Sequence, residues 1–317
     1  MSETTGWECV IVGGGAAGLS AALVLGRARR RVLVLDAGEQ SNLPAHGVGG
    51  LLGHDGLPPA ELYARGRAEL AAYPTIEVVG ARVVGGARTD DGFVLGLQDG
   101  GQVATGRVLL ATGMRYAVPD LPGLAEHWGG AAFHCPYCHG WEVRDGRLAV
   151  MGSVAATHRA LLLRGWSADV VLLTDGPADL DDRDREALRA AGVGVDERRV
   201  AGVEGAGGAL RAVRFADGSA LERDGLLVVA PLVQRTALAV ELGAALNDAG
   251  AVDVDAFAQT TVPRLWAAGD VATQMPQVAA AIAEGSKAAA LINGDLVAEA
   301  SGLPPMVPGR TVPATAA

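Results

Sequence analysis

The chain has 317 residues, of which 50% are hydrophobic and 20% are charged, a composition typical of a globular protein long enough for two domains. A formal net charge of −10 without a basic cluster argues against nucleic acid as a partner. No apolar run approaches the roughly 18 residues needed to span a membrane, and the first residues lack a secretory signal pattern. We therefore expect a cytoplasmic protein without a membrane partner.

A glycine-rich turn near the N-terminus follows a predicted buried strand. The strand covers residues 8–12 and runs directly into GGGAAG at residues 13–18, after which a helix is expected. In dinucleotide-binding folds the three motif glycines allow the tight turn, the approach of a pyrophosphate and the packing of the helix on its strand. A second strand, residues 31–35, ends in Asp36, whose carboxylate can bind a ribose. The predicted cofactor-binding residues here are Gly13, Gly15, Ala16, Ala17, Gly18, Asp36 and Ala37.

The next stretch combines a polar loop, a helix and several short strands. The loop, residues 41–56, contains Asn42, His46 and His54, each of which is either a ligand contact or an ordinary loop residue facing water. A helix is predicted over residues 58–73. The strands that follow are expected to form a β-meander inserted into the nucleotide-binding fold, and they cover residues 76–79, 81–87, 93–97 and 103–105.

Two further strand ends carry short motifs. The strand at residues 108–110 ends in ATG, and a strand far downstream ends in Gly269-Asp270. Together with the glycine-rich turn, these motifs resemble, in the right order, the FAD domain of flavoproteins with two dinucleotide-binding domains. The resemblance implies that FAD is the cofactor, that Asp270 contacts it near the ribityl-phosphate region, and that the amides opening the next helix face the flavin. It adds Ala111, Thr112, Gly113, Gly269, Asp270, Gln277 and Val278 to the predicted cofactor contacts.

The sequence FHCPYCHGW places Cys135 and Cys138 two residues apart, with His134 and His139 on either side. This spacing predicts a redox centre, because a disulfide can close in a tight turn and nearby positive charge can lower a thiol pKa. The motif alone is also compatible with half of a zinc site, with c-type haem attachment or with a thioredoxin-like fold. A zinc site would require four adjacent ligands to converge from one turn, which is poor geometry. Haem attachment requires export, for which the sequence shows no signal peptide. The remaining cysteine lies in the first predicted strand and is expected to fill the core.

A second α/β unit separates the two halves of the FAD domain. Its predicted strands, residues 147–151 and 169–173, alternate with helices at residues 155–166 and 180–190. A split FAD domain around a smaller domain with CxxC resembles the low-molecular-weight thioredoxin reductases along nearly the whole chain. We therefore predict an α/β fold with two Rossmann-like domains. Residues 1–117 and 237–300 form the FAD domain, residues 118–236 form an NADPH-domain-like redox domain, and residues 301–317 form a flexible tail.

In thioredoxin reductases the second domain binds NADPH, but the nucleotide-binding signals are weak in this chain. After the strand ending at Met151 the sequence is GSVAAT, so Val154 stands where backbone would have to meet a pyrophosphate. The next strand ends in TDGPAD, where the reductases carry a basic cluster for the 2′-phosphate. We expect a collapsed nucleotide site. A weak NAD site, with Asp175 on the ribose, is the alternative left open.

The cysteine segment, HCPYCHGWE, resembles FAD-dependent oxidases that form disulfides in gliotoxin- and holomycin-type natural products. The resemblance implies that Cys135 forms the mixed disulfide with substrate and that Cys138 is the inner thiol that reacts with the flavin. His134 is the predicted general base, because a free imidazole has a pKa near 6.5, and Asn42 is its implied orienting partner. His139 either shares the proton transfer or caps the turn. The two aromatic residues of the segment, at positions 137 and 141, either line the substrate pocket or pack locally.

The resulting prediction is an FAD-dependent dithiol oxidase. It would form an intramolecular disulfide in a small-molecule dithiol, of dithiolopyrrolone or epidithio type, and would reduce molecular oxygen to hydrogen peroxide. Family resemblance also implies a homodimer. One alternative is a thioredoxin-disulfide reductase linked to NAD(P)H or ferredoxin, and another is a flavin-binding redox sensor that does not turn over.

Overall fold

The computed structural model describes residues 6–152 and 155–304, and the chain divides into two compact units. The first unit takes in the N-terminal stretch up to Ser41, the stretch Ala60–Arg115 and the stretch from Leu232 onwards. The second unit comprises Asn42–Pro59 and Tyr116–Pro231. The loop that begins at Asn42 therefore groups with the second unit, whereas the sequence prediction counted it in the FAD domain.

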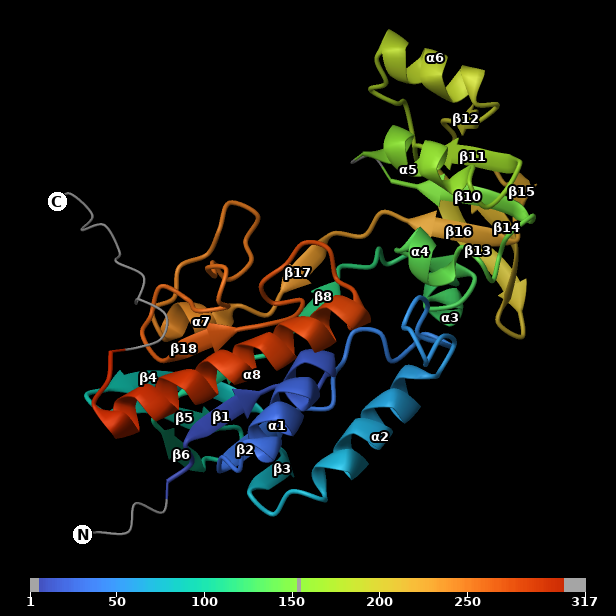
Figure 1. Ribbon diagram of the computed structural model, residues 1–317. Helices are drawn as coiled ribbons and strands as arrows, with labels where there is room; N and C mark the ends of the chain where they lie inside the picture. Colours follow the sequence, from blue (N-terminus) through green and yellow to red (C-terminus); the bar gives the residue numbers. More distant parts are fainter. Residues whose placement is uncertain (1–5, 153–154, 305–317) are drawn as a thin grey trace, which may run out of the picture. The chain divides into compact units, whose positions relative to one another are not determined.

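The first unit is built on a five-stranded parallel sheet with strand order β18-β7-β1-β2-β3. Helices α1 and α8 run beside each other along one face of this sheet (Figure 1). The opposite face carries the antiparallel meander β4-β5-β6 and the short helix α7. The sheet strands are β1 (Cys9–Val12), β2 (Val32–Asp36), β3 (Ile76–Gly80), β7 (Val108–Leu110) and β18 (Leu265–Ala267). The other elements are α1 (Ala16–Arg27), α2 (Pro59–Leu70), β4 (Val83–Thr89), β5 (Gly92–Leu97), β6 (Gln102–Thr105), α7 (Ala237–Glu241) and α8 (Val278–Ser301).

Strand β1 is buried on both faces. Side chains alternate along a strand, so each half of its apolar residues packs against a different layer. Cys9 and Ile11 pack with the α1 and α8 layer, and Val10 and Val12 pack with the meander layer. Burial raises the pKa of the Cys9 thiol to about 12, so this cysteine is a neutral core residue. The all-apolar strand thus fixes the carboxyl end of β1, where the glycine-rich turn begins.

The strand at Ile76–Gly80 is not part of the meander, contrary to the prediction. It pairs in parallel with β2, with Val32 opposite Ile76, and forms the edge of the five-stranded sheet. The reason is the preceding helix α2, which makes β2, α2 and β3 a βαβ unit, and such a crossover returns the chain parallel to the first strand. The meander therefore has three strands.

The second unit contains a parallel sheet with strand order β12-β11-β10-β16-β9 and a separate antiparallel sheet, β13-β14-β15. The chain passes from one unit to the other four times, and the strands at the last two of these passages, β8 (Met114–Tyr116) and β17 (Leu232–Gln234), form a two-stranded sheet. The parallel strands are β9 (Ala132–Phe133), β10 (Arg147–Met151), β11 (Asp169–Leu173), β12 (Gly194–Asp196) and β16 (Gly225–Val228). The remaining elements are α3 (Leu124–His127), α4 (Pro136–His139), α5 (Ala156–Leu163), α6 (Asp182–Ala190), β13 (Val200–Ala206), β14 (Ala209–Phe215) and β15 (Ala220–Glu222).

These elements confirm an α/β fold with parallel sheets in both units, as predicted. Most of the predicted C-terminal tail, residues 305–317, lies outside the described residues. Among the helices of the described ranges, none combines the length and the apolar character that crossing a membrane requires.

Candidate active site

The glycine-rich turn of the first unit leaves room for a ligand at only one of its motif glycines. Gly13 has φ +113°, and a Cβ there would lie 2.1 Å from the carbonyl oxygen of Ala111. A Cβ on Gly18 would lie 1.9 Å from the carbonyl oxygen of Gly13. A Cβ on Gly15 would meet only the Cγ of Gln40, at 3.5 Å. Gly13 and Gly18 are thus required by packing, whereas Gly15, which precedes helix α1, faces space that a phosphate group can approach.

Asp36 lies at the carboxyl end of β2 and is held by two side chains. Its carboxylate accepts hydrogen bonds from Gln40 Nε2 at 3.0 Å and from Arg67 Nη1 at 3.2 Å. It also helps to line a pocket of about 560 Å³ in the first unit, beside the ends of β2 and β3. The pocket is further lined by Ala37, Gly38, Arg67, Val78, Gly80, Ala81, Arg82 and Gln98. A pocket of this size can take a nucleoside.

The predicted ATG segment follows β7 and is tied to both the glycine turn and a distant residue. Ala111 N donates to the carbonyl of Val12 at 2.8 Å, which holds the segment beside the end of β1. Thr112 Oγ1 donates to the carbonyl oxygen of Arg235 at 2.8 Å. Arg235 N donates in turn to the carbonyl oxygen of Gly113 at 3.0 Å. The chain that returns from the second unit therefore fixes this turn.

Asp270 follows the left-handed Gly269, which has φ +77°, at the end of β18. Glu284, on α8, accepts a hydrogen bond from Gly269 N at 2.8 Å. Burial, and then the nearby Glu284 carboxylate, raise the pKa of Asp270 to about 6. Within the described part of the chain, no donor reaches the Asp270 carboxylate, so it is a largely buried acceptor available to ligand hydroxyls. Gln277 and Val278 form the start of α8, where the backbone N–H groups carry partial positive charge.

The residues of the first unit fit FAD. They offer a glycine-lined approach for a diphosphate at Gly15, a carboxylate and a pocket for an adenosine at Asp36, and a partly buried carboxylate for a polyol at Asp270. The predicted contacts thus come from the ends of β1, β2, β7 and β18, which share the carboxyl edge of one parallel sheet.

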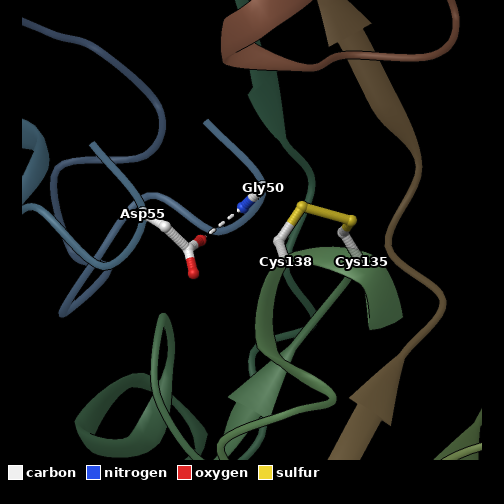
Figure 2. Close-up of a disulfide and its surroundings, with 4 residues drawn as sticks. All are labelled: Gly50, Asp55, Cys135 and Cys138. Carbon is white, nitrogen blue, oxygen red and sulfur yellow. Dashed lines mark hydrogen bonds between the residues drawn. A yellow bond between two sulfur atoms is a disulfide. The ribbon is translucent and has the colours of Figure 1, made fainter. Parts of the chain in front are cut away.

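The second unit holds the predicted redox centre, and Cys135 and Cys138 form a disulfide there (Figure 2). Strand β9 leads into it, and Pro136 is the first residue of the four-residue helix α4. Cys138 N and His139 N both donate to the carbonyl oxygen of Cys135 at 3.2 Å, which closes the turn around the disulfide. Proline has no backbone N–H, and the first N–H groups of a helix have no partner within it, so Pro136 favours this tight turn.

The loop that begins at Asn42 packs against this disulfide segment. A Cβ on Gly49 would lie 2.6 Å from the carbonyl oxygen of Cys138, so only glycine allows the approach. Next to it, Gly50 N donates to Asp55 Oδ1 at 2.8 Å and closes the loop on itself, as Figure 2 shows. The loop thereby joins the second unit, and it brings Asn42 into the same unit as His134. The pairing of Asn42 with His134 stays a prediction.

His134 is half-buried beside an aromatic ring. Its imidazole lies 5.2 Å from the ring of Tyr116, measured between centroids. Burial, and then the positive charge of Arg159, lower the pKa of His134 to about 4, while a backbone hydrogen bond at Val228 opposes the shift. Its buried Nδ1 has no hydrogen-bond partner among the residues that the structure describes. The imidazole is therefore neutral at pH 7. Its pKa lies well below the ordinary value of a free imidazole, on which the sequence prediction rests.

His139 lies on the other side of the disulfide and packs on the core. Its ring stacks on Phe133 with centroids 5.8 Å apart, and burial lowers its pKa. Nearby, the exposed Trp141 ring is covered by the guanidinium of Arg144, 4.0 Å from the ring centroid. Two neutral imidazoles thus flank the disulfide. In residues 6–152 and 155–304, no cluster of three or more His, Cys, Asp or Glu is arranged to hold a metal ion.

At the ends of β10 and β11, where a second nucleotide would bind, protein groups contact both Gly152 and Asp175. A Cβ on Gly152 would lie 2.6 Å from Val229 Cβ, and Val154, the residue predicted to block a pyrophosphate, lies outside the described residues. Asp175 accepts a hydrogen bond from Val200 N at 2.8 Å and lies 3.9 Å from Arg199. Its carboxylate is thus already bound by protein, which leaves less of it for a ribose.

The chain matches a known protein family and resembles known proteins along most of its length. Residues 7–285 match the family model described as pyridine nucleotide-disulphide oxidoreductase. The chain belongs to this family. It is 34% identical to thioredoxin reductase tcpT of Claviceps purpurea, over 95% of this chain and 98% of that protein. It is 30% identical to thioredoxin reductase sirT of Leptosphaeria maculans, over 90% of this chain and 93% of that protein.

Among solved structures, the crystal structure of HlmI superposes with a TM-score of 0.91 and 40% identity, covering 95% of this chain and 96% of HlmI. These relationships confirm the predicted resemblance and cofactor, and the protein is an FAD-dependent oxidoreductase of this family. Sequence reasoning missed Arg235 and Glu284, which hold the turns after β7 and β18. Neither residue lies in a motif. The structure reveals them through the hydrogen bond from Arg235 N to the carbonyl oxygen of Gly113 and the one that the Glu284 carboxylate accepts from Gly269 N.

Proposed function

We propose that this protein is a dithiol oxidase. It converts a small-molecule dithiol and molecular oxygen into the corresponding intramolecular disulfide and hydrogen peroxide, so that two electrons and two protons pass from sulfur to oxygen. The observation that carries the proposal is the Cys135–Cys138 disulfide, which the imidazole of His134 directly precedes in the chain. A neutral imidazole takes a proton from a thiol, which oxidation of a dithiol requires.

Each half of the reaction uses one unit. In the first unit, Gly15, Asp36 and Asp270 would hold FAD through its diphosphate, its ribose and its ribityl chain. Held there, FAD would supply a two-electron acceptor for the dithiol form of the cysteine pair and a reduced flavin that oxygen can oxidise.

The chain's own residues carry the exchange at sulfur. His134 takes a proton from the first substrate thiol, and the thiolate attacks Cys135 to form a mixed disulfide with release of Cys138 as a thiolate. The second substrate thiol then displaces Cys135 and its proton passes to the departing Cys135 sulfur, which completes the product disulfide and leaves Cys135 as a thiol. A thiolate next to His134 raises the pKa of the imidazole, so the proton is held more firmly as the disulfide opens.

The second unit supports an oxidase more than an NADPH-dependent reductase. The arginines near the end of β11 are matched by carboxylates: Arg198 pairs with Asp196 at 2.5 Å, and Arg185 lies 3.7 Å from Glu197. Arg199 faces the side chain of Asp175. A 2′-phosphate would have to compete with these carboxylates for its cations.

The substrate class follows from the resemblance of the cysteine segment to disulfide-forming oxidases of natural-product pathways. We therefore propose a dithiol of dithiolopyrrolone or epidithio type as substrate. We also propose that the enzyme acts in the cytoplasm as a homodimer, which rests on the sequence pattern and on family resemblance alone.

The deciding experiment follows oxidised-flavin absorbance of the purified protein without oxygen. A small dithiol is expected to bleach the flavin, whereas NADPH and NADH leave it yellow. Admission of air should restore the colour and produce one equivalent of peroxide. Rapid bleaching by NADPH, with reduction of thioredoxin, would instead show a reductase. Bleaching by none of the three would point to a redox sensor without turnover.

A further inference from the structure

Three arginines lie near the carboxyl edge of the first unit's sheet, and two of them form ion pairs with carboxylates. Arg67 forms an ion pair with Asp36 at 3.2 Å, and Arg82 forms one with Glu39. Arg235 forms none with any carboxylate in the part of the chain that the structure describes. Its charge helps to lower the pKa of the nearby Glu39, but that carboxylate is paired with Arg82, so Arg235 is the arginine of the three without an ion pair among the described residues.

The Arg235 guanidinium is fixed in place by backbone carbonyls. Its Nη1 donates to the carbonyl oxygen of Glu39 at 2.8 Å and to that of Thr112 at 3.3 Å. These carbonyls belong to the loops after β2 and β7, on opposite sides of β1 in the sheet. Within the described residues, Nε and Nη2 have no partner, so further donors remain for a ligand.

The position of Arg235 relates it to the glycine-rich turn. Gln40, the residue after Glu39, is the nearest neighbour that a Cβ on Gly15 would meet, at 3.5 Å. Ala111, the residue before Thr112, lies against Gly13. The two loops that hold the guanidinium thus also border the turn where a dinucleotide diphosphate approaches.

We infer that Arg235 binds the diphosphate of FAD. The glycine-rich turn itself contains no cation, and arginine matches phosphate oxygens with parallel N–H donors. Arg235 would therefore supply the positive charge that the turn lacks. Its hydrogen bonds to the two carbonyl oxygens hold the guanidinium in a fixed position beside the turn. The inference rests on the proposed placement of FAD in the first unit, and it is independent of the substrate and of turnover.

The test measures binding to the full-length protein after removal of FAD. FAD affinity is followed by flavin fluorescence, and ADP and adenosine are used as competitors. R235Q is expected to weaken FAD and ADP about 10- to 100-fold each and to leave adenosine unchanged, since adenosine has no phosphate. R235K, which keeps the charge, should restore part of the loss, and R88Q, which removes an exposed charge from β4, should behave as wild type.

The outcomes separate a phosphate contact from a purely structural role. If Arg235 only buttresses the loops, R235Q weakens adenosine and ADP by the same factor, and the inference is wrong. Unchanged FAD affinity in R235Q also overturns it. Failure of ADP to compete with FAD in the wild-type protein would overturn the placement of FAD itself. Circular dichroism and thermal unfolding of each variant check that the fold is intact.

Discussion

The two histidines beside the disulfide have the same sequence setting but different surroundings. His134 lies against Tyr116 and near the positive charge of Arg159, whereas His139 stacks on Phe133. Burial is the largest cause of the lowered pKa of both imidazoles. Nδ1 of His134 and both ring nitrogens of His139 are buried without a hydrogen-bond partner among the described residues. His134 directly precedes Cys135, the cysteine proposed to receive the substrate thiolate, so its position and not its pKa makes it the candidate base.

This state of His134 predicts an unusual pH profile. With a pKa of about 4, the base form is fully present above about pH 5 and is lost only as pH falls through 4. Substrate thiols stay protonated below about pH 8. The rate of flavin reduction by a dithiol should therefore change little between about pH 5 and pH 8 in rapid-mixing measurements.

The variant H134A should lose this plateau. Its rate would follow the thiolate fraction of the substrate and fall about tenfold for each pH unit below the thiol pKa. H158A removes an exposed imidazole from α5 and serves as the control. If H134A keeps the flat profile, His134 is not the base.

At the scale of elements, helix α8 supports the turn after β18. The hydrogen bond from Gly269 N to Glu284 holds the backbone that presents Asp270, and the Glu284 carboxylate helps to raise the pKa of Asp270 to about 6. A cofactor hydroxyl that donates to Asp270 favours the ionised carboxylate. The apoprotein should therefore bind FAD more weakly as pH falls through about 6.

Replacing Glu284 separates its charge from its hydrogen bond. E284Q keeps a carbonyl oxygen for Gly269 N but removes the negative charge, so the loss of FAD affinity should move to lower pH. E284A also removes the acceptor and should weaken FAD about tenfold at every pH. The exposed E69Q on α2 is the control. An identical midpoint in wild type and E284Q would show that Glu284 does not influence Asp270.

The elements show what sequence could and could not predict. The glycine turn, ATG and Gly269-Asp270 follow apolar strands, and local pattern placed all three at strand ends. Strand β3 was missed as a sheet strand because its short apolar run fits a meander equally well, and only the βαβ crossover decides. The pKa of His134 and the contacts of Arg235 depend on residues distant in sequence, which spacing cannot reveal.

At the scale of the whole molecule, the two units divide the chemistry. The disulfide and its histidines belong to the second unit, and the residues that fit FAD belong to the first. The loop from Asn42 to Pro59 lies between two segments of the first unit in sequence, but it packs on the disulfide segment. The second unit is thus assembled from two separate stretches of chain. Substrate oxidation and flavin reoxidation should therefore be separable by mutation.

The variant C138S tests this division. It keeps every residue that fits FAD, so the purified protein should be as yellow as wild type, but without the inner thiol a dithiol should reduce its flavin at least 1,000-fold more slowly, roughly 4 kcal/mol in barrier. Dithionite reduces the flavin without the cysteines, and air should then reoxidise it at the wild-type rate. C9S, in the buried core of the other unit, is the matched control for loss of a thiol. Rapid dithiol reduction in C138S would mean that substrate delivers electrons to FAD without the disulfide, and slow reoxidation would mean that the second unit also takes part in the reaction with oxygen.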